Sequence, residues 1–107
     1  MWARHAATLA LRVVPVVPAA VVAQAWRGGR RQARLARFLT GCNIDALDEH
    51  QARSAGELLA RAGTTDVVDA CVVEGALRRR DLVVSSDIDD LSQLAAAVNR
   101  RLEIARP

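Results

Sequence analysis

Two Asp-x-x-Asp pairs are the residues of this 107-residue chain whose types and spacing best suit chemistry. Asp66 and Asp69 open a run of apolar residues at helical spacing. Asp87 and Asp90 open the next such run, shortly after the apolar segment 82–84. Carboxylates that converge are the ligands that hard cations such as Mg²⁺ prefer. The four acids are therefore candidate ligands for Mg²⁺ or Mn²⁺.

The elements around these acids decide whether they can meet. Residues 66–80 have the apolar periodicity of an amphipathic helix packed on a sheet. The apolar positions of this helix are Val67, Val68, Cys71, Val72, Ala76 and Leu77. Residues 82–84 have the composition of a strand that is buried on both faces. Asp87 then follows the carboxyl end of a central strand, where open α/β sheets bind ligands, and Asp69 can face it from the preceding helix.

The same acids also have a purely structural interpretation. An Asp at the start of a helix accepts hydrogen bonds from free backbone amides and complements the helix dipole. Such a cap stabilises a helix by about 0.5–2 kcal/mol. Asp48 and Gln51 show a similar spacing at the start of another expected helix, residues 49–62, without any sign of chemistry. Spacing by itself favours capping over a metal site.

Three segments of the chain carry a family likeness, and their order and spacing are more specific than any one of them. They are VVPAAVVAQAWRGG at 16–29, GTTDVVDA at 63–70 and VVSSDIDDL at 83–91. Together with the helices between them, they resemble PIN-domain ribonucleases, especially the VapC-type toxins of bacterial toxin–antitoxin pairs. The likeness spans nearly all of the chain from Val13 onward.

The resemblance implies a function for particular residues. It places catalytic, metal-binding acids at Asp69 and Asp87, and Ser85 stands where a Thr is common in the family. Asp66 and Asp90 lie one helical turn away and would either tune the metal or cap their helices. The resemblance also directs Gln24 into the same pocket.

The chain departs from the family pattern in two places. The opening strand that ends in the family's first Asp is missing, and Gln24 stands where most members carry an acid. Because an amide brings no charge to a cation, we expect weak Mg²⁺ binding and little ribonuclease activity. Either Met1 is an internal residue of a longer protein, or the gene is a remnant. The start in mid-helix without an N-cap favours the first explanation.

Composition limits the classes of protein to which the chain can belong. Its length suits one small domain, residues 1–107, which we interpret as PIN-like and N-terminally shortened. All 15 basic residues are Arg, and the lack of Lys excludes a standard P-loop or a Schiff-base enzyme. Only three residues are aromatic, too few for a base-stacking platform. Cys42 and Cys71 have no metal-ligand spacing, and Cys71 suits a core position.

Arginines concentrate in and just before an expected helix at residues 30–40. Arg27, Arg30, Arg31, Arg34 and Arg37 lie within eleven residues, in a chain with a net charge of +3 and a pI of about 10.0. We expect the first four of them to bind RNA phosphates. A solvated charged face and a surface for an acidic partner protein are the alternatives.

The first 25 residues have some features of a secretory signal, including the Ala-Gln-Ala triplet at 23–25. Arg12 interrupts the apolar region, however, and Pro15 and Pro18 break any helix through it. The longest run without charge has 14 residues, which is too short to span a bilayer. We therefore expect a cytoplasmic protein without a membrane partner.

The remaining segments complete an alternating pattern of helices and strands. Helices are expected at 3–12, 18–27, 30–40, 49–62, 66–80 and from Ile88, and strands at 13–17, 43–47, 82–84 and 101–105. Because every strand is followed by a helical crossover, the pattern predicts a three-layer α/β/α sandwich with a mostly parallel central sheet.

Three functions remain open at this point. The first is a PIN-type, Mg²⁺-dependent endoribonuclease of a toxin–antitoxin pair, with RNA, an antitoxin protein and a second copy of the chain as partners. The second is a catalytically inactive PIN fold that binds a partner peptide, and the third is a small secreted domain.

Overall fold

The computed structural model describes residues 14–107 of the chain. Its elements are β1 (Val16–Pro18), α2 (Ala19–Ala25), the 3₁₀ helix η2 (Arg30–Gln32), α3 (Ala33–Thr40), β2 (Asn43–Asp45), α4 (Glu49–Ala62), α5 (Val67–Arg79), β3 (Leu82–Val84), α6 (Ile88–Ala96) and β4 (Glu103–Ala105). The expected order of helices and strands is confirmed from β1 onward. The expected helix 3–12 lies outside the described residues.

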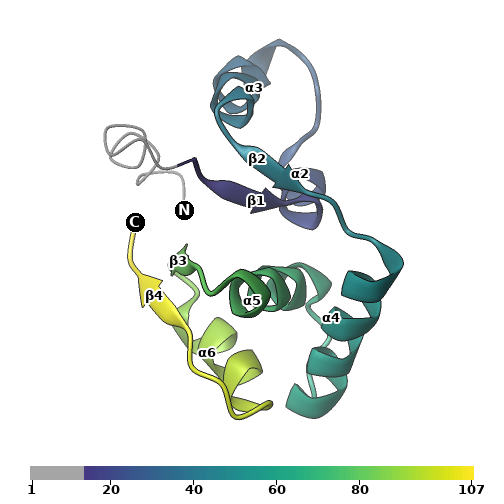
Figure 1. The fold of residues 1–107 in the computed structure, drawn as a ribbon. Coiled ribbons are helices and arrows are strands. Elements are labelled where there is room, and N and C mark those ends of the chain that lie inside the picture. The colour runs from purple at the N-terminus through teal and green to yellow at the C-terminus, as the bar shows by residue number, and fades with distance from the viewer. Residues whose placement is uncertain (1–13) are drawn as a thin grey trace.

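The described strands form two separate parallel pairs. β1 pairs with β2, with Val16 opposite Asn43, and β3 pairs with β4, with Leu82 opposite Glu103. The chain accordingly divides into two lobes, the first with β1, α2, η2, α3 and β2 and the second with α4 to β4 (Figure 1). The α/β class is confirmed. A central sheet that joins all four strands, and with it a three-layer sandwich, is not seen within residues 14–107.

The relative placement of the two pairs differs from that of strands in one parallel sheet. Asp45 is the last residue of β2, whereas Asp81 directly precedes β3. Arg79 contacts both carboxylates, each at 2.6 Å. The carboxyl end of the first pair therefore lies beside the amino end of the second. In a single parallel sheet, by contrast, all carboxyl ends share one edge.

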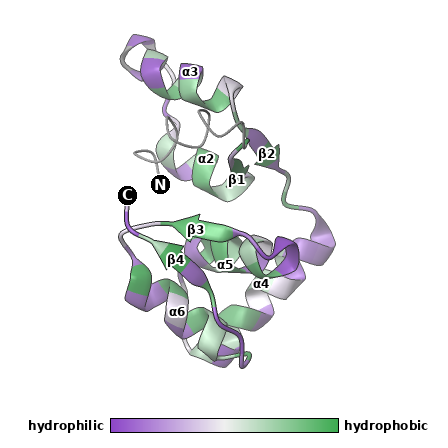
Figure 2. Cartoon of the chain, turned by 60° about the vertical axis from the view of Figure 1, so that its left-hand side comes forward, coloured by the Kyte–Doolittle hydropathy of each residue, from purple (hydrophilic) through white to green (hydrophobic). Residues whose placement is uncertain are grey.

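The hydrophobic core lies mainly in the second lobe, around α5. Its buried members come from α4, α5, β3 and α6 and are Leu58, Val73, Ala76, Val83, Leu91, Leu94 and Ala95. Figure 2 shows the hydrophobic stretches of β3, β4 and α5 next to one another in this lobe. α5 is also in contact with α2 and β1 of the first lobe, so it is the helix that both lobes share.

Local signals place the ends of α4 as the sequence predicts. The Asp48 carboxylate accepts a hydrogen bond from the Gln51 backbone N–H at 2.8 Å, and the Gln51 side chain accepts one from the Asp48 N–H, which completes a capping box. Gly63 ends the helix in the left-handed conformation, with φ of 71°. Among the described helices, none is long and apolar enough to cross a membrane.

The first lobe is less well packed than the second. Helix α3 contains no buried residue, and its expected core side, formed by Leu35, Phe38 and Leu39, is only half-buried. The helix stands at the far end of this lobe, away from α4, α5 and α6 (Figure 1). The arginines of this region are therefore displayed on an element with little support from the core.

Candidate functional site

Four aspartates stand at the amino-terminal ends of α5 and α6. Asp66 and Asp69 belong to the start of α5, and Asp87 and Asp90 to the start of α6. The pKa of Asp69 rises from its usual value to about 6, first because the carboxyl is partly buried and then because Asp66, Asp87 and Asp90 place negative charge near it. Burial and these neighbouring charges make Asp69 costly to ionise, and the convergence of the four acids on one cation stays a prediction.

Asp66 fulfils the structural interpretation of the motif. Its Oδ1 accepts a hydrogen bond from the Asp69 backbone N–H at 3.0 Å, which caps α5. One oxygen of this carboxylate is therefore engaged by the backbone. Asp66 is better described as a cap with a spare oxygen than as a dedicated metal ligand.

Asp87 behaves differently, although it holds the same position before α6. Its side chain makes no capping hydrogen bond, and the residue is exposed. Its backbone N–H donates to the Ser85 Oγ at 3.0 Å, so Ser85 fixes the turn that presents Asp87. The Ser85 N–H in turn donates to the Ala105 carbonyl oxygen at 3.0 Å, which anchors this turn to β4. The Asp87 carboxylate is thus held out by a rigid turn without being used in a cap.

The donor set suits a hard cation in chemistry but is not a complete cage. Carboxylate oxygens are the ligands that Mg²⁺ and Mn²⁺ prefer. Within residues 14–107, however, no group of three or more His, Cys, Asp or Glu side chains has the arrangement needed to hold a metal ion. A cation between Asp69 and Asp87 would relieve their repulsion, but water would have to supply most of its other ligands.

Gln24 does not join the acids in the described structure. It lies on α2 and is exposed, and it makes no hydrogen bond to any of the four aspartates. Helix α2 packs on α5 through Ala20, which contacts the cluster of Ala55, Ala70 and Cys71. The helix is therefore next to α5, but Gln24 does not lie on its packed side.

The arginine strip lies in the first lobe and is largely open to solvent. Arg30, Arg34 and Arg37 are exposed on η2 and α3, and Arg31 also belongs to η2. Arg27 instead folds back on the end of α2, where its Nη1 donates to the Ala23 carbonyl at 3.1 Å and the Trp26 carbonyl at 2.7 Å. Arg27 therefore has a structural role as well, which spacing did not reveal.

Gln32 is an organising residue of this region that sequence reasoning missed. Its Oε1 accepts hydrogen bonds from the backbone N–H groups of Arg27 at 2.5 Å and Gly28 at 2.7 Å. Its Nε2 donates to the Ala25 carbonyl at 2.8 Å. One side chain thus holds the turn in which Gly28 and Gly29 adopt φ of 76° and 87°. The Gly-Gly pair predicted a turn, but no spacing rule identifies the amide that closes it.

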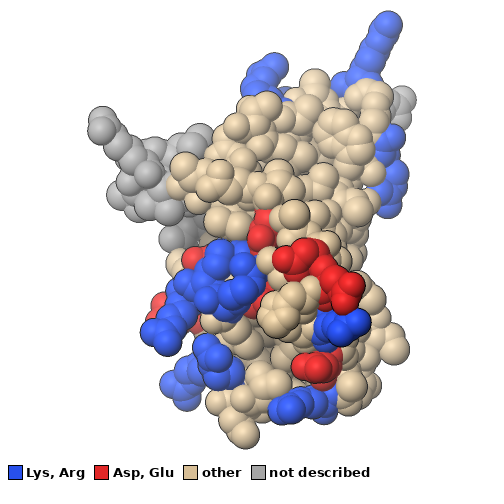
Figure 3. Space-filling model, turned by 45° about the vertical axis from the view of Figure 1, so that its right-hand side comes forward, with Lys and Arg blue, Asp and Glu red and all other residues tan. Residues whose placement is uncertain are grey.

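The arginine strip and the aspartates occupy different parts of the molecule. Figure 3 shows arginines at the end of the first lobe, and acids together with further arginines over the second. The arrangement can bring a polyanion to one lobe and a cation to the other. Searches of protein-family models, of curated proteins and of solved structures find no match to this chain.

Proposed function

We propose that this chain is a PIN-type, Mg²⁺-dependent endoribonuclease of toxin–antitoxin kind with weak activity. The support for it is the position of Asp66 and Asp69 at the start of α5 and of Asp87 and Asp90 at the start of α6, where burial and neighbouring negative charge raise the pKa of Asp69 to about 6. A carboxylate held near other carboxylates gains most from a cation, because the cation removes the repulsion between them.

Each acid then has a role in phosphodiester hydrolysis. Asp69 and Asp87 would hold Mg²⁺ or Mn²⁺, which neutralises charge on the phosphoryl oxygens and lowers the pKa of an attacking water. Asp66 and Asp90 would complete the negative field, with one oxygen of Asp66 kept by the cap of α5. Ser85 would keep Asp87 in position through its hydrogen bond to the Asp87 N–H. Gln24 would line the pocket after a movement of its exposed side chain.

The arginine strip would bind the RNA strand. Exposed guanidinium groups on η2 and α3 offer donors to successive phosphates, and the strand would continue from there toward α5. The proposal includes a PIN-like three-layer sandwich, which requires a further strand to join the β1/β2 and β3/β4 pairs. It also includes an antitoxin protein and a second copy of the chain as partners in the cytoplasm.

A titration with Mn²⁺ tests the metal site directly. Asp69→Asn and Asp87→Asn should each weaken Mn²⁺ binding severely, as measured by the relaxation of water protons. Asp89→Asn is the matched control, because Asp89 has the same charge and lies beside Asp90 without raising the pKa of Asp69. Equal affinity in the two test variants and the control would remove Asp69 and Asp87 from the site.

A catalytically inactive PIN fold that acts as a binding module for a partner peptide is the second candidate. It is favoured by the lack, within residues 14–107, of a three-acid group arranged to hold a metal. In that case no cleavage of single-stranded RNA should appear over time, either with Mg²⁺ or with a chelator. Cleavage that needs Mg²⁺ and disappears in Asp87→Asn would reject this candidate.

A further inference from the structure

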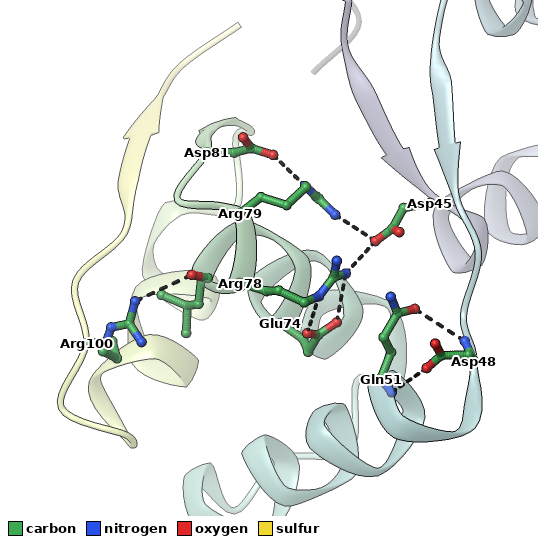
Figure 4. Close-up of polar contacts among 9 residues, drawn as sticks. Asp45, Asp48, Gln51, Glu74, Arg78, Arg79, Asp81 and Arg100 are labelled. Carbon is green, nitrogen blue, oxygen red and sulfur yellow. Dashed lines mark hydrogen bonds and ion pairs between the residues drawn. The ribbon is translucent and has the colours of Figure 1, made fainter.

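An ion network connects the two lobes where β2 ends (Figure 4). The Asp45 Oδ2 accepts hydrogen bonds from Arg78 Nη2 at 2.7 Å and from Arg79 Nη1 at 2.6 Å. Arg78 Nε also donates to Glu74 at 2.9 Å, and Arg79 Nε donates to Asp81 at 2.6 Å. One carboxylate of the first lobe is thus held by two guanidinium groups of α5, and each of these is oriented by a second acid.

The charges of this network are partly shielded from water. The exposed fraction is 22% for the Asp45 side chain and 23% for that of Arg79. Burial raises the pKa of Asp45, but the hydrogen bonds and charges of Arg78 and Arg79 outweigh it, so the pKa lies below its usual value. The pKa of Arg78 is raised by its hydrogen bonds to Glu74 and Asp45. The ionised forms of Asp45 and Arg78 are therefore favoured where they lie.

Gly75 gives Arg79 the space that this contact needs. A Cβ added at Gly75 would lie 2.8 Å from Arg79 Nη2 and 2.9 Å from Arg79 Nη1. The guanidinium group therefore lies directly over the Gly75 backbone, one turn back along α5. Glycine in the interior of a helix is unfavourable relative to alanine, so its presence here has a physical reason in the position of Arg79.

The other contacts between the lobes are apolar, and they join α2 and β1, with its buried Val17, to α5. Ala20 of α2 packs on Ala55, Ala70 and Cys71, and residues 46–48 form the only covalent connection between β2 and α4. Such apolar contacts are non-directional. The ion network is directional, and it lies at the end of β2 where this angle is set.

We propose that Asp45, Arg78 and Arg79 form an ionic latch that fixes the orientation of the first lobe on α5, with Gly75 as the residue that makes room for it. When the latch opens, the first lobe turns about residues 46–48. The latch is independent of the function proposed above, because it concerns the joint between the lobes and does not require cleavage of RNA.

Two glycine variants test the role of Gly75. Gly56→Ala is the matched control, because Gly56 lies within α4 and an added Cβ there has no neighbour within 4 Å. It should raise the folding equilibrium constant about two- to fivefold through helix propensity. Gly75→Ala should give a smaller gain or a loss, because it displaces Arg79. In an Arg79→Ala background, Gly75→Ala should match the control, whereas equal gains for both glycines in the wild-type background would refute this role.

The orientation of the lobes can be measured as a distance between two spin labels. The labels replace Thr40 of α3 and Ala60 of α4, both exposed, in a chain with Cys42→Ser and Cys71→Ala. The distance distribution of the wild-type chain should be narrow at low salt and broaden only slightly at about 1 M salt, because partly buried ion pairs are screened less than exposed ones. Asp45→Asn should be broad at both salt concentrations.

Glu49→Gln is the control for a loss of charge near the joint. It removes a surface ion pair with Arg53, whose side chain is 77% exposed, and the distance distribution should not change. A narrow distribution in Asp45→Asn at low and high salt, equal to that of the control, would overturn the latch.

Discussion

The two lobes of this chain differ in charge and in packing. Residues 14–44 contain no Asp or Glu, whereas all 12 acids of the chain lie in residues 45–107. In the second lobe Glu49, Glu74 and Asp81 pair with arginines, whereas the aspartates at the start of α5 and α6 place negative charge near one another. The exposed arginines of the first lobe have no acid within that lobe before Asp45. Uncompensated positive charge therefore lies in the first lobe, and uncompensated negative charge at the starts of α5 and α6 in the second.

The lobes also differ in how many of their side chains are buried and so contribute to the stability of the fold. Leu91 and Leu94 of α6 are each 2% exposed within the core of the second lobe, whereas α3 of the first lobe has no buried residue. The exposed arginines are therefore carried by the first lobe, which has fewer buried side chains. The aspartates belong to the second lobe, which contains most of the hydrophobic core.

The largest expected effect is on RNA cleavage, and it comes from a further strand between the two strand pairs. An N-terminal extension that adds a strand ending in Asp, placed between the β1/β2 and β3/β4 pairs, should raise Mg²⁺-dependent RNA cleavage by orders of magnitude. Each tenfold change corresponds to only about 1.4 kcal/mol of barrier, which an additional metal ligand can supply. Cleavage of a labelled single-stranded RNA measures the effect. Asp87→Asn in the extended chain controls for a contaminating nuclease, and strong cleavage by the unextended chain that Asp87→Asn abolishes would show that two acids suffice.

Stability should respond much more strongly to truncation in the second lobe. Leu91→Ala should lower the free energy of unfolding by about 2–5 kcal/mol, because it leaves a cavity in the core. Leu35→Ala, the same change on half-buried α3, should cost about 1 kcal/mol or less. Urea unfolding followed by circular dichroism measures both. Similar losses for the two variants would mean that the lobes share one core.

RNA binding should depend on the arginines of the first lobe only. Changing Arg30 and Arg34 to Gln should flatten the plot of log affinity against log salt by about 1–2 units, at about 0.7–0.9 per phosphate contact. The control is the same change at Arg53 and Arg61, exposed arginines of α4. Fluorescence anisotropy with a labelled single-stranded RNA gives the slopes. If both pairs change the slope equally, the strip has no special role.

The smallest effect is a pH dependence of stability that arises from Asp69. Its pKa is about 6 in the folded chain and about 3.9 in an unfolded one. Between these values the folded state binds more protons, so the stability contributed by Asp69 is complete below about pH 4 and is lost as pH rises through 6. Asp69→Asn should remove this loss and gain stability relative to wild type above pH 6. Thermal unfolding at pH 4 and pH 7 tests this, with Asp89→Asn as control, and parallel curves for all three proteins would contradict it.

Local chemistry explains which features could be predicted from the sequence. The caps at Asp48 and Asp66 and the end of α4 at Gly63 follow from short-range patterns, and the structure contains each of them. Strand pairing depends on distant residues, so the sequence could not show that the strands form two pairs. Likewise, Val67 was expected on the buried face of α5 but is 54% exposed, because it is the first residue of the helix.

Contacts between residues that are far apart in the sequence, and contacts of a side chain with the backbone, could not be predicted either. Nothing about Gly75 identifies Arg79 as the group that lies over it, since a glycine pattern does not name its neighbour. The contact of Asp45 with Arg79 joins residues 34 positions apart, beyond the reach of helical periodicity. The position of the aspartates at helix starts could thus be predicted from the sequence. The contacts between the two lobes could not.

The pairing of each strand with the next strand in sequence has a consequence for how the chain folds. β1 pairs with β2 inside the first lobe, and β3 pairs with β4 inside the second. Among residues 14–107, each strand finds its partner within its own lobe, so the search for native pairing is short and folding should be fast for an α/β protein. Native-state hydrogen exchange should then reveal two units of different protection. Amides of α5 and α6 should exchange last, and those of α3 should exchange first.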